Sequence, residues 1–246
     1  MKSSDRICVI GGGRIGLPIS VRLAGVGAKV EILDLDEEKI SKINSGESPF
    51  FEEGMQAILE SSVGEGRLKA TSNQDVISSC NIIISAIGTG INDDGTPDVE
   101  SLENLSEMLS SRLSPGDILI LKTTLPIGTT EKIANTLSEK SGLRLEEELL
   151  VAFCPERIVE GKAMHELEVL PKIVGGIGEK STIRAQEVMK LLGGEVVTVS
   201  NSRTSEMCKL LDNAYRITRF GFAADVASVA EKIGVDAFEA IKSSNY

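Results

Sequence analysis

The chain has 246 residues, 41% of them hydrophobic, and a mean hydropathy of +0.04, which together are typical of a folded protein with one large or two modest domains. Its 26 basic and 37 acidic residues give a formal net charge of −11, which disfavours general binding to the anionic backbone of nucleic acids. No stretch approaches the roughly 18 apolar residues of a membrane-spanning helix, so we expect no membrane association.

The N-terminus and the cysteines bear on the cellular compartment. The segment "MKSSDRICVI" runs directly into a strand-like stretch and has no charged-then-apolar leader. The four cysteines are scattered and lack the spacing of metal ligands; they are Cys8, Cys80, Cys154 and Cys208. We therefore expect reduced thiols, no metal site and a cytoplasmic protein.

The first 34 residues predict a nucleotide-binding turn. A buried strand, a glycine turn, a helix and a second strand follow one another, and Gly11, Gly13 and Gly16 have the G-x-G-x-x-G spacing. The first glycine permits the tight turn, the second lets the main chain approach a pyrophosphate, and the third lets the helix pack on the sheet. Asp34 ends the second strand, where a carboxylate accepts hydrogen bonds from an adenosine ribose and disfavours the 2′-phosphate of NADP. The alternative is an ordinary glycine-rich turn with Asp34 as a strand terminator.

The same alternation of strands and helices continues along the chain. Further strands are predicted in "CNIIISAIG" (80–88), "DILIL" (117–121), "ELLVAF" (148–153), "PKIVGGIG" (171–178) and "EVVTVS" (195–200). Helices are predicted near 36–44, 53–62, 99–112, 128–140 and 180–192. This pattern predicts an α/β fold with a Rossmann-type, doubly wound parallel sheet over residues 1–200.

Ligands of such sheets bind beyond the carboxyl ends of the strands. That rule selects three places as one potential rim: Gly88 with Thr89, Thr123 with Thr124, and the loop "CPERIVEG" (154–161).

The last 46 residues predict a long helix. In "EMCKLLDNAYR" (206–216) the apolar positions recur at helical spacing, and Lys209, Asn213 and Arg216 line one stripe at i, i+4 and i+7. The pattern continues to about residue 234, so the helix has about 30 residues and a length on the order of 45 Å. The stripe is either the solvated face of this helix or part of a site. We expect residues 201–246 to be a connecting helix and the beginning of an all-helical domain.

These motifs together resemble the UDP-glucose/GDP-mannose dehydrogenase family, the nucleotide-sugar 6-dehydrogenases. The resemblance is carried by "GGGRIGLP", "GESPFFEEGMQAIL", "LKTTLPIGTTEKI", "CPERIVEG" and "TSEMCKLLDNAYR". The form "CPERIVEG" is more similar to the branch that acts on UDP-N-acetyl-D-mannosamine or UDP-N-acetylglucosamine. The resemblance implies oxidation of the C6 alcohol of a UDP-sugar to a carboxylate with two NAD in succession, and a homodimer formed through the helical region.

The resemblance also implies catalytic roles. Lys209 matches the lysine that polarises the C6 oxygen and handles its proton, and Asn213 matches the asparagine that holds that oxygen. Arg216 matches a contact to the sugar nucleotide. Glu156 matches a glutamate that positions or deprotonates water, its alternative being a loop carboxylate paired with the neighbouring arginine. Thr124 matches a position near the cofactor, and we expect it to take part in catalysis as well as in cofactor binding.

Further positions match binding residues of the family. Arg157 and Ile158 fit a substrate-contacting stretch, Thr89 and Glu160 match positions near the cofactor, and Lys39 matches a basic residue beside the adenosine ribose. The complete expected NAD site is Gly11, Gly13, Arg14, Ile15, Gly16, Asp34, Lys39, Gly88, Thr89, Thr123, Thr124 and Glu160.

One family motif has no counterpart in the 246 residues. The nucleophilic cysteine of the family lies in a Gly-x-Gly-x-Gly-Gly-x-Cys segment, and none of the four cysteines matches it; Cys154, which precedes a proline, is the only one near the expected site. We therefore expect a fragment of a longer enzyme, or a truncated natural product, that binds NAD but has negligible turnover alone.

Two other functions are compatible with these residues. The β-hydroxyacid dehydrogenases also join a Rossmann domain to helices with a Lys-x-x-x-Asn pair, and they need a single hydride transfer. A non-catalytic NAD-binding module is the second alternative. Replacing Lys209 by alanine separates an enzyme from a pure binding module, because the enzyme loses turnover and keeps its NAD affinity, whereas the module loses neither. Oxidation of a small hydroxyacid with one NADH, without any response to UDP-sugars, would favour the β-hydroxyacid dehydrogenases.

Overall fold

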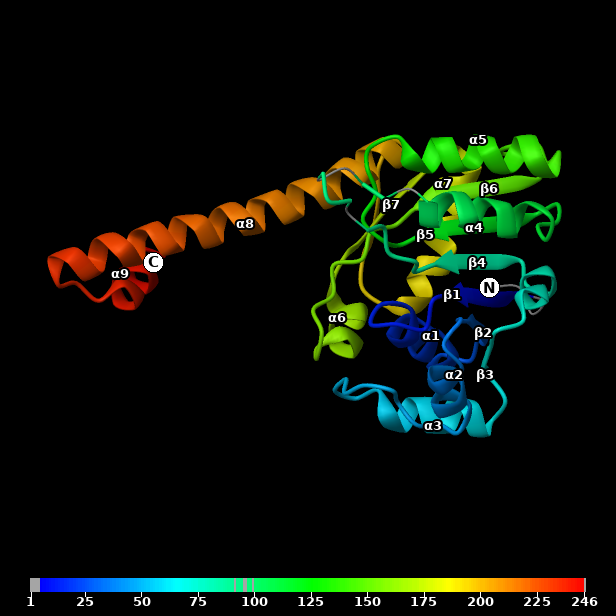
Figure 1. Cartoon of the computed structure of the whole chain (residues 1–246), viewed down its shortest axis with the longest axis horizontal. Helices are drawn as coiled ribbons and strands as arrows, with labels where there is room; N and C mark the ends of the chain where they lie inside the picture. The colour runs from blue at the N-terminus through cyan, green and yellow to red at the C-terminus, as the bar shows by residue number, and fades with distance from the viewer. Residues whose placement is uncertain (1–4, 91, 95–96, 99, 246) are drawn as a thin grey trace. The chain divides into compact units, whose positions relative to one another are not determined.

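The computed structural model describes residues 5–90, 92–94, 97–98 and 100–245, and it divides into two compact units, Met1–Glu206 and Met207–Tyr246. Within the described part of unit 1, eight strands form one sheet in the order β3-β2-β1-β4-β5-β6-β7-β8 (Figure 1). The strands are β1 Arg6–Ile10, β2 Lys29–Leu33, β3 Leu68–Thr71, β4 Ile82–Ser85, β5 Asp117–Leu121, β6 Leu149–Phe153, β7 Lys172–Gly176 and β8 Val196–Thr198.

Helices connect these strands. They are α1 Gly16–Gly25, α2 Glu37–Asn44, α3 Gln56–Gly64, α4 Glu100–Ser110, α5 Thr129–Ser141, α6 Ala163–Val169 and α7 Glu179–Met189, with 3₁₀ turns η1 Gln74–Ser79 and η2 Lys190–Leu192. The Rossmann-type, doubly wound fold followed by a long helix is confirmed. Residue 99, where we predicted the start of α4, lies outside the described residues.

The sheet differs from the prediction in its last two strands. Strands β1 to β6 are all parallel to one another. Strand β7 pairs antiparallel with β6, in the register Ala152↔Gly176 and Phe153↔Gly175, and β8 is parallel to β7. The predicted parallel sheet is therefore confirmed for β1 to β6, and the one departure from it is the antiparallel pairing of β7 with β6. The residues of β7 that pair with β6 are Gly175 and Gly176. The lack of a side chain at Gly175 lets this part of the chain pack against Asn201, because a Cβ there would lie 2.2 Å from the carbonyl oxygen of Asn201.

Strand β3 was not predicted. Its four residues, LKAT, include an exposed lysine and a small alanine, and they pair only with β2 at the edge of the sheet. A strand this short carries too little alternation for its sequence to distinguish it from a loop. The short helix α6 was missed for the same reason.

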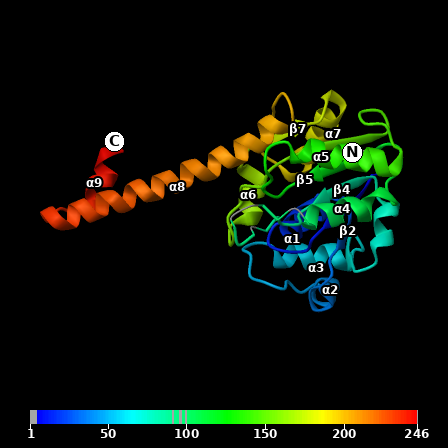
Figure 2. The same ribbon diagram turned by 45° about the horizontal axis from the view of Figure 1, so that its top comes forward.

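The core lies on both faces of the sheet. Because side chains alternate along a strand, Ile118 and Ile120 of β5 enter one hydrophobic cluster while Leu119 and Leu121 enter the other. The first cluster includes residues of α1, α3, α6 and α7, and the second includes residues of η1, α4 and α5. Figures 1 and 2 both show α1, α2 and α3 beside one another. Burial on both faces explains the continuous apolar runs of the central strands.

Unit 2 is helical. Helix α8, Ser202–Ile233, begins in unit 1 and continues through unit 2, and α9, Ala237–Ser244, follows a turn at Gly234. The predicted helix of about 30 residues is therefore confirmed. Unit 2 exposes many large apolar side chains, including Leu211, Tyr215, Ile217, Phe220 and Phe222. The domain boundary at residue 200 stays a prediction.

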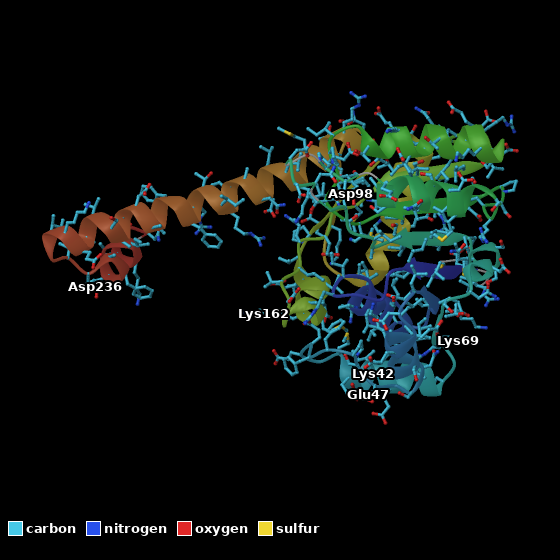
Figure 3. All side chains as sticks on the ribbon, in the orientation of Figure 1. Lys42, Glu47, Lys69, Asp98, Lys162 and Asp236 are labelled. Carbon is cyan, nitrogen blue, oxygen red and sulfur yellow. The ribbon has the colours of Figure 1, made fainter. Side chains whose placement is uncertain are left out.

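Charged side chains cover the outside of both units. Figure 3 shows Lys42, Glu47 and Lys69 on unit 1 and Asp236 on unit 2. No helix in the described part of the chain has the length and apolarity to cross a membrane.

Candidate active site

The glycine turn between β1 and α1 has the geometry that its sequence predicts. Gly11 adopts φ +96° and its N–H donates to the carbonyl oxygen of Leu33 at 2.8 Å. A Cβ on Gly16 would lie 1.7 Å from the carbonyl oxygen of Gly11, so the helix packs against the turn at a distance that only glycine permits. A Cβ on Gly13 would meet nothing within 4 Å, so this glycine borders open space. The turn leaves room for a pyrophosphate beside the main chain at the N-terminal end of α1.

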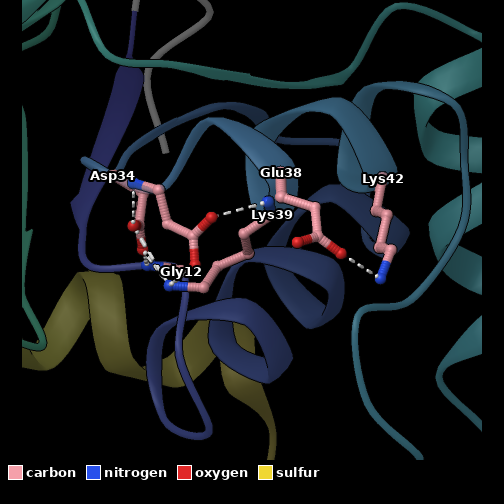
Figure 4. A network of polar contacts seen from close by, with 6 residues as sticks. Gly12, Asp34, Glu38, Lys39 and Lys42 are labelled. Carbon is pink, nitrogen blue, oxygen red and sulfur yellow. Dashed lines mark hydrogen bonds and ion pairs between the residues drawn. The ribbon is translucent and has the colours of Figure 1, made fainter.

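Asp34 lies against this turn at the end of β2. Figure 4 shows its carboxylate accepting from the N–H of Gly12 at 2.6 Å and from the ammonium of Lys39 at 3.0 and 3.1 Å. Burial raises the pKa of Asp34, but the N–H of Asp36, the Lys39 ammonium and the Gly12 N–H together lower it by a larger amount, so that the pKa lies below its ordinary value. Asp34 is therefore an ionised acceptor with a cation beside it.

A cavity of about 360 Å³ opens beside Asp34. Its walls come from the ends of β1 and β2, the segment after β4, η1 and α4. They are mostly apolar: Ile10, Gly11, Leu33, Leu35, Ile87, Leu105 and Met108, with Asp34, Gln74, Ser101 and Asn104. An apolar cavity with a few convergent polar groups is typical of a cofactor site, and an adenine with its ribose near Asp34 fits this chemistry.

Two threonines connect the loops that follow β4 and β5. The hydroxyl of Thr123 donates to the carbonyl oxygen of Ile87 at 2.7 Å, and the hydroxyl of Thr89 donates to the carbonyl oxygen of Thr124 at 2.8 Å. Gly88 lies between Ile87 and Thr89 in the sequence, and its carbonyl oxygen accepts from the Ser101 hydroxyl at 3.4 Å. The structure thus brings four of the predicted rim residues together, and it uses two hydroxyls to hold the rim in place.

Arg14 lies between two loops at the start of α1. Its guanidinium stacks over the ring of Phe50, 4.5 Å from the ring centre, and lies 3.8 Å from the carboxylate of Glu160. The neighbouring Ile15 packs against the core. The predicted cofactor residues Arg14 and Glu160 are therefore neighbours.

Glu156 is held in the segment after β6 by two backbone donors and one cation. Its carboxylate accepts from the N–H of Arg157 at 2.8 Å and of Ile158 at 3.3 Å, and it lies 3.0 Å from the ammonium of Lys122. Burial raises the pKa of Glu156, but Lys122 and these N–H groups together lower it by a larger amount, so that the pKa lies below its ordinary value. Lys122 was not predicted from the sequence. The available signal was a lysine two positions after Ile120, on the face of a strand that is otherwise apolar.

The neighbours of Glu156 have other partners. The Arg157 guanidinium donates to the carbonyl oxygen of Pro171, so the alternative in which it pairs with Glu156 is wrong. Ile158 is half-buried and packs against the core. Cys154 is fully buried, and burial raises its pKa, which disfavours the thiolate that a nucleophile requires.

Three predicted residues belong to unit 2. Lys209 and Asn213 are half-buried and lie one turn apart on α8, and Arg216 forms an ion pair with Asp212 at 3.6 Å. Their approach to the rim residues of unit 1 stays a prediction. Among the residues that the structure describes, no group of His, Cys, Asp and Glu side chains could hold a metal ion.

Known proteins resemble this chain over nearly its whole length. UDP-N-acetyl-D-mannosamine dehydrogenase of Pyrococcus horikoshii is 33% identical over 240 residues, covering 98% of this chain and 57% of that protein. NDP-N-acetyl-D-galactosaminuronic acid dehydrogenase of Ralstonia nicotianae is 30% identical over 246 residues, covering 97% and 57%. The solved structure of UDP-D-ManNAc dehydrogenase from P. horikoshii superposes with a TM-score of 0.93 at 33% identity and the same 98% and 57% coverage. The chain thus spans 57% of the length of these relatives.

The model of the NAD-binding domain of the UDP-glucose/GDP-mannose dehydrogenase family matches residues 5–192, which include the glycine turn, Asp34, the threonine rim and Glu156. This match identifies NAD as the cofactor, and the open space at Gly13 with the cavity beside Asp34 fits it. The chain belongs to the UDP-glucose/GDP-mannose dehydrogenase family.

Proposed function

We propose that this chain provides the NAD-binding part, and a portion of the substrate site, of a cytoplasmic nucleotide-sugar 6-dehydrogenase. Its reaction is the oxidation of the C6 alcohol of a UDP-N-acetylhexosamine to a uronic acid with two NAD. The observation that carries the proposal is one sheet edge that holds the glycine turn, Asp34 with its cavity, and the ionised Glu156. The relatives named for UDP-N-acetyl-D-mannosamine favour that sugar.

Unit 1 binds and orients the cofactor in this proposal. NAD accepts the hydride when it is bound. The main chain at Gly11 and Gly13 would hold the pyrophosphate, and Gly16 lets α1 pack close to the turn. Asp34 accepts from the ribose hydroxyls, which requires the Lys39 ammonium to release some of the acceptor positions that it now occupies. The remaining contacts are Arg14, Ile15, Gly88, Thr89, Thr123, Thr124 and Glu160.

The residues on α8 handle the alcohol. A hydride leaves the C6 carbon only if the proton of the alcohol is removed and the negative charge on its oxygen is stabilised. Lys209 polarises that oxygen and handles its proton, and Asn213, one turn along the helix, holds the oxygen. Arg157, Ile158 and Arg216 contact the sugar nucleotide. Glu156 accepts a hydrogen bond from a sugar hydroxyl or a water.

The 246 residues contain no Gly-x-Gly-x-Gly-Gly-x-Cys segment, so we propose that this polypeptide binds both ligands but does not complete the two-step oxidation alone. The test measures NADH formation from NAD and UDP-N-acetylmannosamine, with binding of each ligand followed by calorimetry. We expect binding with a negligible NADH yield. Two NADH per sugar would falsify the partial role, and absence of NAD binding contradicts the whole proposal.

We further propose that the chain forms a homodimer through α8. The exposed apolar side chains of unit 2, Leu211, Tyr215, Ile217, Phe220 and Phe222 among them, support this proposal, because exposed apolar side chains of this size gathered on one element mark a contact surface.

A further inference from the structure

Lys122 is an unusual core residue. It directly follows β5, where its N–H donates to the carbonyl oxygen of Ser85 at 3.0 Å and its own carbonyl oxygen accepts from the N–H of Glu156 at 2.9 Å. Its side chain continues the alternation of Ile118 and Ile120 and therefore enters the same hydrophobic cluster as they do. Only 1% of the side chain is exposed, so the ammonium is shielded from bulk water.

The neighbours of this ammonium come from the segment after β6 and from α7. It lies 3.0 Å from Oε2 of Glu156, 3.5 Å from the sulfur of Cys154 and 4.0 Å from the sulfur of Met189. Of these three, the two sulfurs are weak acceptors, so Glu156 is the partner that compensates the buried charge. A buried lysine without an anion becomes neutral, because desolvation penalises its charged form.

The carboxylate of Glu156 is equally dependent on Lys122. Its side chain is 10% exposed, and two backbone N–H groups, those of Arg157 and Ile158, donate to Oε1. The other oxygen, Oε2, faces the lysine. Burial lowers the pKa of Lys122, but Cys154 and Glu156 raise it by a larger amount, so that it lies above its ordinary value. The pKa of Glu156 is correspondingly held below its ordinary value. Both groups therefore carry their charges at neutral pH.

We propose that Lys122 is a positioning residue for Glu156: its buried ammonium keeps this carboxylate ionised and oriented at the carboxyl edge of the sheet, so that Glu156 acts as a fixed hydrogen-bond acceptor for a substrate hydroxyl or a water. The inference rests on the proposed function for the role of Glu156. A general base works best with a pKa near the operating pH, and Lys122 moves Glu156 away from that range. Glu156 therefore orients its partner and does not store the proton.

The test is an NMR titration of the Glu156 side-chain carboxyl carbon in the whole chain, assigned by comparison with Glu156→Gln. In the wild-type chain we expect titration below the ordinary value of 4.5. In Lys122→Met the proton affinity of Glu156 rises about tenfold or more, because an opposite charge at this distance is lost. Lys122→Arg restores the charge and part of the effect. The matched control is Lys42→Met, which removes a lysine of α2 that pairs with Glu38 at 2.8 Å; we expect it to leave the Glu156 titration close to wild type.

A second variant keeps the test decisive if Lys122→Met does not fold. The pair Lys122→Met with Glu156→Gln removes both charges together, and we expect it to fold where the single variant fails. The inference is overturned by a wild-type Glu156 that titrates at or above 4.5, by a folded Lys122→Met with an unchanged Glu156 titration, or by a double variant no more stable than Lys122→Met. The titration needs no ligand. A chain that titrates as expected but binds no UDP-N-acetylmannosamine contradicts the proposed function and leaves the Lys122 assignment in place.

Discussion

Buried charges in unit 1 find their partners far along the chain. Asp5 pairs with Arg184 at 2.8 Å, and Glu52 accepts from the N–H of Ala163 at 2.6 Å, across more than a hundred residues in each case. A sequence pattern identifies the local role of a residue, such as a glycine in a turn. It does not identify which distant strand end a carboxylate will face, and for this reason Lys122 was missed while Asp34 was predicted.

Lys172 gives a prediction on pH. Its ammonium donates to the carbonyl oxygens of Leu167 and of Gly193, and burial lowers its pKa from 10.5 to about 8. Between these two pH values the unfolded chain binds the extra proton and the folded chain does not. The free energy of unfolding contributed by Lys172 therefore rises as pH increases from about 8 to 10.5.

The measurement is urea unfolding of the wild-type chain and Lys172→Met on both sides of that range. We expect the difference between the two unfolding free energies to change in favour of the wild type as pH rises. A difference that stays constant from neutral to alkaline pH contradicts the assignment.

At the scale of elements, long-range carboxylates cap several helices. Glu206 is fully buried near the start of α8 and accepts from the N–H of Gly128 at 2.6 Å, the N–H of Thr130 at 2.8 Å and the Thr130 hydroxyl at 2.6 Å. These groups lie at the N-terminus of α5, whose first N–H groups have no partners within the helix. Glu206 therefore fixes the beginning of α8 to α5.

Replacing Glu206 by alanine leaves these buried donors without an acceptor. We expect a loss of about 2–4 kcal/mol in the free energy of unfolding, measured by chemical denaturation. The matched control is Glu131→Ala, which removes a partly exposed ion pair with Arg203 at 2.8 Å and costs less than about 1 kcal/mol. Equal losses in the two variants contradict the capping role.

Elements were predictable where the signal is local and repeated. The glycine turn and the central strands follow from spacing and from apolar runs, and α8 follows from its long periodic pattern. The reversal of β7 and β8 was not predictable, because strand direction depends on how the chain returns from β6 and not on the composition of β7. The joint position of Thr89, Thr123 and Glu156 was predictable from a rule for strand ends, but their hydrogen bonds were not.

At the scale of the whole molecule, the proposed homodimer predicts a measurable mass. We expect light scattering at high concentration to give about twice 26.2 kDa, and Phe220→Asp to shift the mass towards the monomer, because a charge at an apolar contact is costly to desolvate. Lys242→Asp, on α9, is a control for a change of charge in unit 2. A wild-type chain that stays at 26.2 kDa contradicts the dimer.

The central claim is that the glycine turn of unit 1 binds NAD. The most direct measurement is calorimetric titration of NADH into the wild-type chain and Gly13→Ala, because a Cβ at Gly13 meets no protein atom within 4 Å and enters the open space that we assign to the pyrophosphate. We predict an unchanged melting temperature with an affinity about tenfold lower or worse, whereas Gly64→Ala, at another glycine with open space, binds as wild type. A wild-type chain that does not bind NADH, or a Gly13→Ala chain that binds it equally well, contradicts the claim.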